Sequence, residues 1–269
     1  MFNKIKNKIS QLRVKSIIFH SPHRQALSEI PDAVMTYWQI KAKKEFPGIP
    51  SDAVFFIRAA EGLMEFFECV KRSKRPCALP SKAADSVWHV WNSWSSINLD
   101  CFCQKHFGCT IPHVEAEKMD GPLDLALAAT LVETRYMERL MPASVTVTRL
   151  FALDRKLKMP GGFAYKISRQ QVGFQNMNER GKGKGHMIFP ASFSIIELAA
   201  AGLITAEVYE EAMRQQAKAQ AAANSGGSSC GSGFSDSGGS SSCDAGSGDC
   251  GGSSCGSSCG GGCGGGCGS

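Results

Sequence analysis

The last 45 residues, 225–269, contain 18 Gly, 15 Ser and 7 Cys, and no branched aliphatic residue. Such a segment cannot bury enough apolar surface to offset the entropy lost when its glycines become ordered. We therefore predict a disordered Gly/Ser/Cys-rich tail and a folded region that ends near residue 224. The tail cysteines are candidate reactive thiols: Cys230, Cys243, Cys250, Cys255, Cys259, Cys263 and Cys267.

Before the tail, apolar residues recur at the three- and four-residue spacing of helices that are buried along one face. The clearest run lies between residues 54 and 70, and it predicts a helix capped by Ser51. Ser81 is expected to cap a longer helix that ends at Gly108, and Asp120 is expected to cap the next one. These signals predict a mainly α fold.

The predicted organisation has four parts. A basic amphipathic helix occupies 1–30, a helical domain 31–190, a helical hairpin 191–224 and the tail 225–269. Two stretches of the helical domain are expected to be extended or irregular. The residues from Val145 to Thr148 are predicted to form a short strand, and those from Asn178 to His186 a mobile basic loop.

The first 30 residues are strongly basic. The whole chain has a formal net charge of +6, and removal of the three tail aspartates leaves +9 for the first 224 residues. An apolar face of Phe2, Ile5, Ile9 and Leu12 is expected to pack on the domain, or else to lie on a membrane. Positive charge also favours nucleic acid or anionic lipid as partners, with a solvated helix face as the plainer interpretation. Six cations precede the first acidic residue, Glu29: Lys4, Lys6, Lys8, Arg13, Lys15 and Arg24.

Neither a membrane span nor a secretory signal is expected. No stretch approaches the roughly 20 apolar residues that cross a bilayer, and the longest apolar run near the N-terminus is Ile17-Ile18-Phe19. We therefore predict a cytoplasmic location, where thiols stay reduced.

A group of histidines and cysteines between residues 89 and 113 is the candidate metal site. Four of them follow the pattern Cys-x2-His-x2-Cys-x3-His, and thiolates and imidazoles are the usual ligands of tetrahedral zinc. The alternative interpretation places Cys103 in the core, His89 as a buried, hydrogen-bonded histidine and His113 in a loop. The candidate zinc ligands are His89, Cys103, His106, Cys109 and His113.

The same region carries the best candidate for catalysis, although no complete catalytic motif appears. Asp85 and His89 lie four residues apart, so that the carboxylate could orient the imidazole or merely stabilise the helix. The tryptophans Trp88, Trp91 and Trp94 recur every three residues. They are expected to pack in the core, with stacking on nucleobases as the alternative.

Two resemblances to known families follow from these residues. The stretch from Leu79 to His89, followed by Phe102-Cys103, Phe107-Gly108 and Ile111-Pro112-His113, resembles the bacterial type of the glycine-rich domain-containing (GRDP-like) family. That resemblance implies a helical domain without an established activity. The stretch from Ile195 to Glu211 resembles the C-terminal helical hairpin called SHOCT. It implies oligomerisation or tethering.

Three functional hypotheses follow. The leading one is a non-enzymatic interaction protein, which associates with itself or with another protein, and whose tail binds soft metal ions or exchanges thiols. A second is a precursor whose tail cysteines are converted to azoles. The third is an enzyme of unknown reaction that uses His89.

Overall fold

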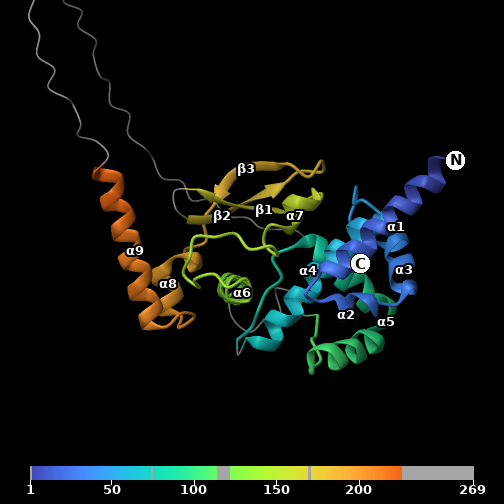
Figure 1. Cartoon of the computed structure of the whole chain (residues 1–269), viewed down its shortest axis with the longest axis horizontal. Coiled ribbons are helices and arrows are strands. Elements are labelled where there is room, and N and C mark those ends of the chain that lie inside the picture. Colours follow the sequence, from blue (N-terminus) through green and yellow to red (C-terminus); the bar gives the residue numbers. More distant parts are fainter. Residues whose placement is uncertain (1, 74, 114–121, 169–170, 226–269) are drawn as a thin grey trace, which may run out of the picture. The chain divides into compact units, whose positions relative to one another are not determined.

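The described part of the chain is built mainly from helices, with one small sheet (Figure 1). The structure is a computed structural model that describes residues 2–73, 75–113, 122–168 and 171–225. The mainly α prediction is therefore confirmed. Residues 226–269 of the predicted tail, which hold all seven of its cysteines, and the expected cap at Asp120 lie outside the described residues. The helices are α1 (Phe2–His20), α2 (Arg24–Ser28), α3 (Asp32–Glu45), α4 (Ala53–Arg72), α5 (Lys82–Phe107), α6 (Leu123–Met137), α7 (Leu153–Leu157), η2 (Ala191–Phe193), α8 (Ile195–Ala200) and α9 (Ala206–Ser225); the strands are β1 (Phe163–Ser168), β2 (Gln171–Met177) and β3 (Gly183–Ile188).

Helix α4 organises the first hydrophobic core. Its N-terminus is capped by Asp52, whose carboxylate accepts hydrogen bonds of 3.0 Å from the backbone N–H groups of Val54 and Phe55. The cap is therefore one residue later than the predicted Ser51. The apolar residues of α4 are buried around most of the helix because it packs against α1, α2, α5, α6 and α7. A helix enclosed on several sides is expected to be apolar on more than one face.

Helix α5 follows the predicted start and end but is interrupted in the middle. Ser81 caps it by accepting a hydrogen bond from the N–H of Ala84, and Gly108 ends it with the positive φ that a left-handed C-cap requires. Ser95 has extended dihedral angles, so the helical path breaks there. Trp88 and Trp91 are buried in the first core, and Trp94 packs at its edge.

The antiparallel sheet β1-β2-β3 is the main departure from the sequence prediction. The segment predicted as a mobile basic loop forms the turn between β2 and β3 and the first four residues of β3. This prediction failed because glycine and lysine are poor strand formers, whereas here they lie on an exposed edge strand. The strand predicted at 145–148 is absent, and those residues form an irregular segment.

That irregular segment is held by side chains of α6 instead of by a strand partner. Arg135, which is almost fully buried, donates hydrogen bonds to the backbone oxygens of Pro142, at 2.8 Å, and Thr146, at 3.4 Å. Thr148 donates to the hydroxyl of Thr134 at 2.9 Å. Buried backbone groups need partners, and here α6 supplies them.

A second core lies between α6, the inner face of the sheet and the last two helices. Phe151, Tyr165 and Phe193 pack there edge to face. The C-terminal helical pair contributes Leu198 from α8, and Ala212 from α9. As predicted, this pair is helical.

The carboxylate of Asp154 connects the two cores. It belongs to α7, it is 1% exposed, and it accepts four hydrogen bonds. Ser81 Oγ donates at 2.6 Å and the backbone N–H groups of Lys82 and Ala83 at 3.0 Å each, all at the start of α5. The N–H of Phe163, at the start of β1, donates at 2.9 Å. Burial raises the pKa of Asp154, and these hydrogen bonds oppose that rise.

The residue at position 162 lies so close to Asp154 that it has no space for a side chain. A Cβ atom on Gly162 would lie 2.5 Å from Asp154 Oδ2. A glycine is therefore required where the chain enters β1. By its internal contacts, the chain up to Ser225 forms one compact unit, and Asp154 joins elements from both cores of that unit.

We expect Asp154→Asn to lower the free energy of unfolding by about 3 kcal/mol, because an amide NH2 would then face backbone N–H donors that have no other acceptor. Urea denaturation followed by circular dichroism measures this loss. The matched control is Asp100→Asn, which makes the same change at an exposed position of α5. Equal stability of the two variants would show that Asp154 does not join the cores.

Candidate functional site

The structure divides the five predicted zinc ligands between different surroundings. His106 Nε2 lies 2.9 Å from Glu29 Oε2, which Lys105 Nζ also contacts at 2.6 Å. Cys103 is fully buried in the first core, and burial raises the pKa of its thiol to about 12. Cys109 packs at the edge of that core. A buried neutral thiol is a poor metal ligand.

His89 and His113 do lie together. Their ring centroids are 5.7 Å apart, and His113 also packs edge to face against Trp88. Within the described residues, however, no three His, Cys, Asp or Glu side chains are placed to hold a metal ion. The zinc prediction therefore has no support from this part of the chain.

The arrangement around His113 is a pair of ion contacts. His113 Nε2 lies 3.1 Å from Asp85 Oδ1, and His89 Nε2 lies 3.5 Å from Glu45 Oε2. The sequence paired Asp85 with His89, whereas the structure pairs it with His113. The first contact brings the segment after α5 back to the start of the same helix, and the second joins α5 to the end of α3. An enzymatic role for His89 stays a prediction, since none of the described pockets is lined by either histidine.

A buried carboxyl group that the sequence analysis missed lies on α4. Glu65 is 5% exposed, and its Oε1 atom has no hydrogen-bond partner among the described residues. The nearest cation is Arg149, whose Nη2 lies 3.9 Å away but whose Nε and backbone N–H bind Glu138. Burial is the main cause that raises the pKa of Glu65 to about 7, with further contributions from Glu138 and Glu61. The sequence signal was a glutamate within the apolar run Leu63-Met-Glu-Phe-Phe67.

The raised pKa predicts a pH-dependent stability. The ordinary pKa of 4.5 applies to the unfolded chain, so the folded protein holds this proton more tightly, and stability falls as pH rises from about 4.5 through about 7. Glu65→Gln should remove this loss, which is at most about 3 kcal/mol. Urea titrations at pH 5 and pH 8 should show the variant gaining stability over the wild type at the higher pH.

The control for this experiment is Glu68→Gln, on the same helix but 28% exposed and paired with Lys71. It should not reproduce the pH-dependent difference. If Glu65→Gln and the wild type lose stability in parallel between these pH values, Glu65 is ionised in the folded protein at neutral pH.

The most distinctive surface of the described residues is on α1. Ile17 is buried, and Val14 and Ile18 pack against the first core. Leu12 and Phe19 are 67% and 70% exposed, and they lie about 140–160° around the helix from Ile17. The predicted packing of Leu12 on the domain is therefore wrong. The residues that pack on the domain come from a second apolar face, which the sequence analysis overlooked.

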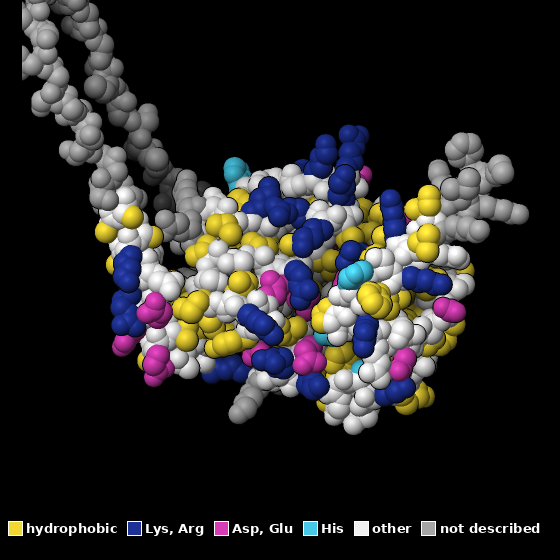
Figure 2. Space-filling view, viewed as in Figure 1, with side chains coloured by type: hydrophobic (Ala, Val, Ile, Leu, Met, Phe, Trp, Pro, Cys, Tyr) yellow, Lys and Arg dark blue, Asp and Glu magenta, His cyan; other side chains and the backbone are white. Residues whose placement is uncertain are grey.

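This exposed stripe, formed by Ile9, Leu12 and Phe19, is bordered by cations. Arg13 and Lys15 are exposed on α1, and neither has an ion pair with a described residue. On the face shown in Figure 2, apolar side chains lie beside Lys and Arg side chains along this part of the molecule. No described helix is both long enough and apolar enough to cross a bilayer.

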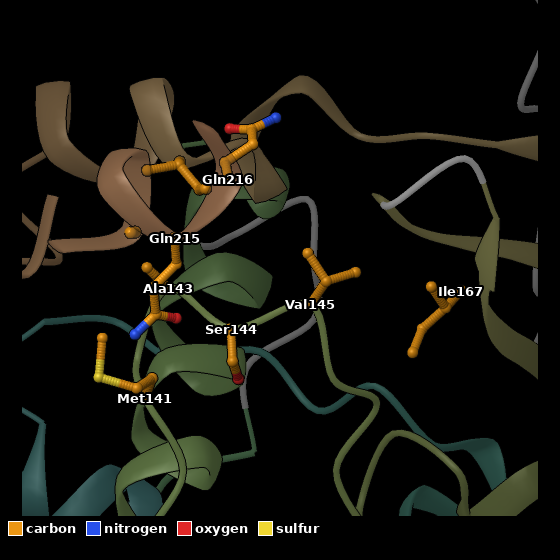
Figure 3. Close-up of a pocket in the computed structure, with 9 residues that line it drawn as sticks. Met141, Ala143, Ser144, Val145, Ile167, Gln215 and Gln216 are labelled. Carbon is orange, nitrogen blue, oxygen red and sulfur yellow. The ribbon is translucent and has the colours of Figure 1, made fainter. Parts of the chain in front are cut away.

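A second apolar surface lies beside α9. Its cleft, of about 360 Å³, is lined by Met141, Val145, Ile167 and Ala212, with the amides of Gln215 and Gln216 at α9 (Figure 3). None of the residues that line it is charged. Its shape and lining suit a neutral, apolar group.

Comparison with known proteins assigns the chain to one family. The chain belongs to the UCP032817-like family, whose model matches residues 39–187. The match extends from α3 to β3 and includes both Glu65 and Asp154, whereas α1, α2, α8 and α9 lie outside it. Searches of curated proteins and of solved structures each found no significant match.

The two resemblances drawn from the sequence are therefore wrong. The Trp-His segment falls inside the UCP032817-like match, and nothing supports a glycine-rich domain family or a SHOCT module. The misleading residues have general structural roles. Ser81 caps a helix, Trp88 packs in the core, and Gly108 and Gly202 adopt positive φ where helices end. Such features recur in unrelated helical proteins.

Proposed function

We propose that the protein is a non-enzymatic interaction protein that attaches to anionic lipid surfaces through α1. The observation that carries the proposal is the exposed stripe of Ile9, Leu12 and Phe19. Leu12 and Phe19 lie on the side of α1 opposite the buried Ile17, and Arg13 and Lys15 border the stripe. Helices with this distribution lie in the plane of the membrane interface, with apolar side chains among the acyl chains and cations near the headgroups.

The apolar stripe favours lipid over nucleic acid. A nucleic-acid interface uses cations on phosphates and polar or aromatic side chains on bases. Exposed Leu12 and Ile9 have no such role. In a membrane interface, by contrast, full burial of a leucine or phenylalanine side chain contributes about 1.5–3 kcal/mol, and each cation near an anionic surface adds about 1 kcal/mol.

Self-association through the same stripe is less favourable electrostatically. In a two-fold symmetric dimer each copy contributes the same patch. The cations at the border, Arg13 and Lys15, would then lie near their own copies, and the first acidic residue of the chain is Glu29. An anionic lipid surface supplies the opposite charge.

The seven tail cysteines extend this proposal on the basis of sequence alone. They lie outside the described residues, and the body has its own core without them. We retain thiol exchange or binding of soft metal ions as their proposed role, because cysteine thiolates support both kinds of chemistry.

The proposal predicts binding of the full-length protein to vesicles that contain phosphatidylglycerol and weak binding to pure phosphatidylcholine vesicles. Leu12→Ser and Phe19→Ser should each lower the partition coefficient about tenfold, since each removes more than 1.4 kcal/mol of apolar transfer. Co-sedimentation with vesicles at 50 and 300 mM salt measures both effects, and binding should weaken at the higher salt.

The control is Ile97→Ser, which removes an apolar side chain that is 76% exposed on α5 and leaves α1 unchanged. It should bind as the wild type does. No binding to anionic vesicles, or equal losses for Ile97→Ser and Leu12→Ser, would refute the proposal. Concentration-dependent dimerisation that is abolished by Leu12→Ser would assign the stripe to self-association instead.

A further inference from the structure

An open groove of about 610 Å³ lies between α1 and α2, next to the exposed stripe. Each helix contributes residues four positions apart, Lys15 with Phe19 from α1 and Arg24 with Ser28 from α2, which is the spacing of neighbours on one helical face. Phe19 belongs to both the stripe and the groove. The residues that line the groove are Lys15, Ile18, Phe19, Arg24, Gln25 and Ser28.

The charged side chains that line the groove are all positive. Lys15 and Arg24 come from different helices, no acidic residue is among the lining side chains, and neither cation has an ion pair with another described residue. Two unpaired cations on one groove favour a ligand that carries two negative charges. Arg24 can donate two parallel hydrogen bonds to phosphate oxygens, while Lys15 acts as a compact point charge.

We propose that this groove binds the terminal phosphate of a phospholipid headgroup. A phosphate monoester carries about −1.5 to −2 charges at neutral pH, so it matches the two cations better than the singly charged phosphate diester of phosphatidylglycerol. Ile18 and Phe19 border the same groove and would contact the glycerol and upper acyl chain. The inference rests on the proposed attachment of α1, and it adds a preference among anionic lipids.

The test compares two vesicle types that are matched in surface charge, one with phosphatidic acid and one with phosphatidylglycerol. The full-length protein should bind the phosphatidic acid vesicles several times more tightly. Arg24→Gln should lower binding to these vesicles about tenfold, as expected for the loss of a hydrogen-bonded ion pair, and it should largely remove the preference.

The matched control is Arg13→Gln, which removes the same charge from an exposed position outside the groove. It should weaken binding to both vesicle types by a similar factor, about fivefold, and leave the preference intact. Equal binding of the wild type to the two vesicle types, or equal effects of Arg24→Gln and Arg13→Gln, would overturn the headgroup inference while the attachment through α1 stands. Failure to bind either vesicle type would overturn both, and thermal unfolding confirms that each variant is folded.

Discussion

The buried carboxylate of Asp154 is the contact on which the arrangement of the two cores depends. Its four donors come from the start of α5 and the start of β1, elements that lie about 80 residues apart in the chain and belong to different cores. A buried carboxylate is stable only when its oxygens are hydrogen-bonded. The first residues of a helix have backbone N–H groups without partners inside the helix. The N–H groups of Lys82 and Ala83 can therefore bind Asp154 without breaking a hydrogen bond of α5. The Asp154 side chain therefore has two roles: it pairs the free N–H groups at the start of α5, and it joins the two cores.

The features that were predictable from the sequence are those that depend on neighbouring residues. The Ser81 cap and the Gly108 stop of α5 each depend on a few suitable residue types at one position, and both were predicted correctly. The sheet was not found because its strands are short and carry glycines, such as Gly173, Gly183 and Gly185. Tyr165 of β1 packs edge to face against Phe151, which lies outside the sheet, and Phe151 in turn packs against Phe193. Local propensity does not contain that information.

The difference between local sequence signals and contacts made by the fold also explains why the candidate sites were predicted wrongly or missed. The spacing of Cys103, His106 and Cys109 matches that of metal ligands, but α5 ends at Phe107, so Cys109 lies beyond the helix that carries the other two. Cys103 is buried in the core, while His106 contacts Glu29, which follows α2. Glu65 was missed for the opposite reason. The charges near its carboxyl group belong to Arg149 and Glu138, which lie more than 70 residues later in the chain.

Helix α1 carries apolar residues on two opposite sides, and a helix at the edge of a monomer can bury only one of them. Ile17 is buried against the body, so Leu12 and Phe19 remain in water unless a partner covers them. A large exposed apolar surface is unfavourable for a monomer, and it usually marks an interaction site. The family match begins at Gln39, after both α1 and α2. The proposed attachment through α1 and the groove beside α2 would therefore involve none of the matched residues.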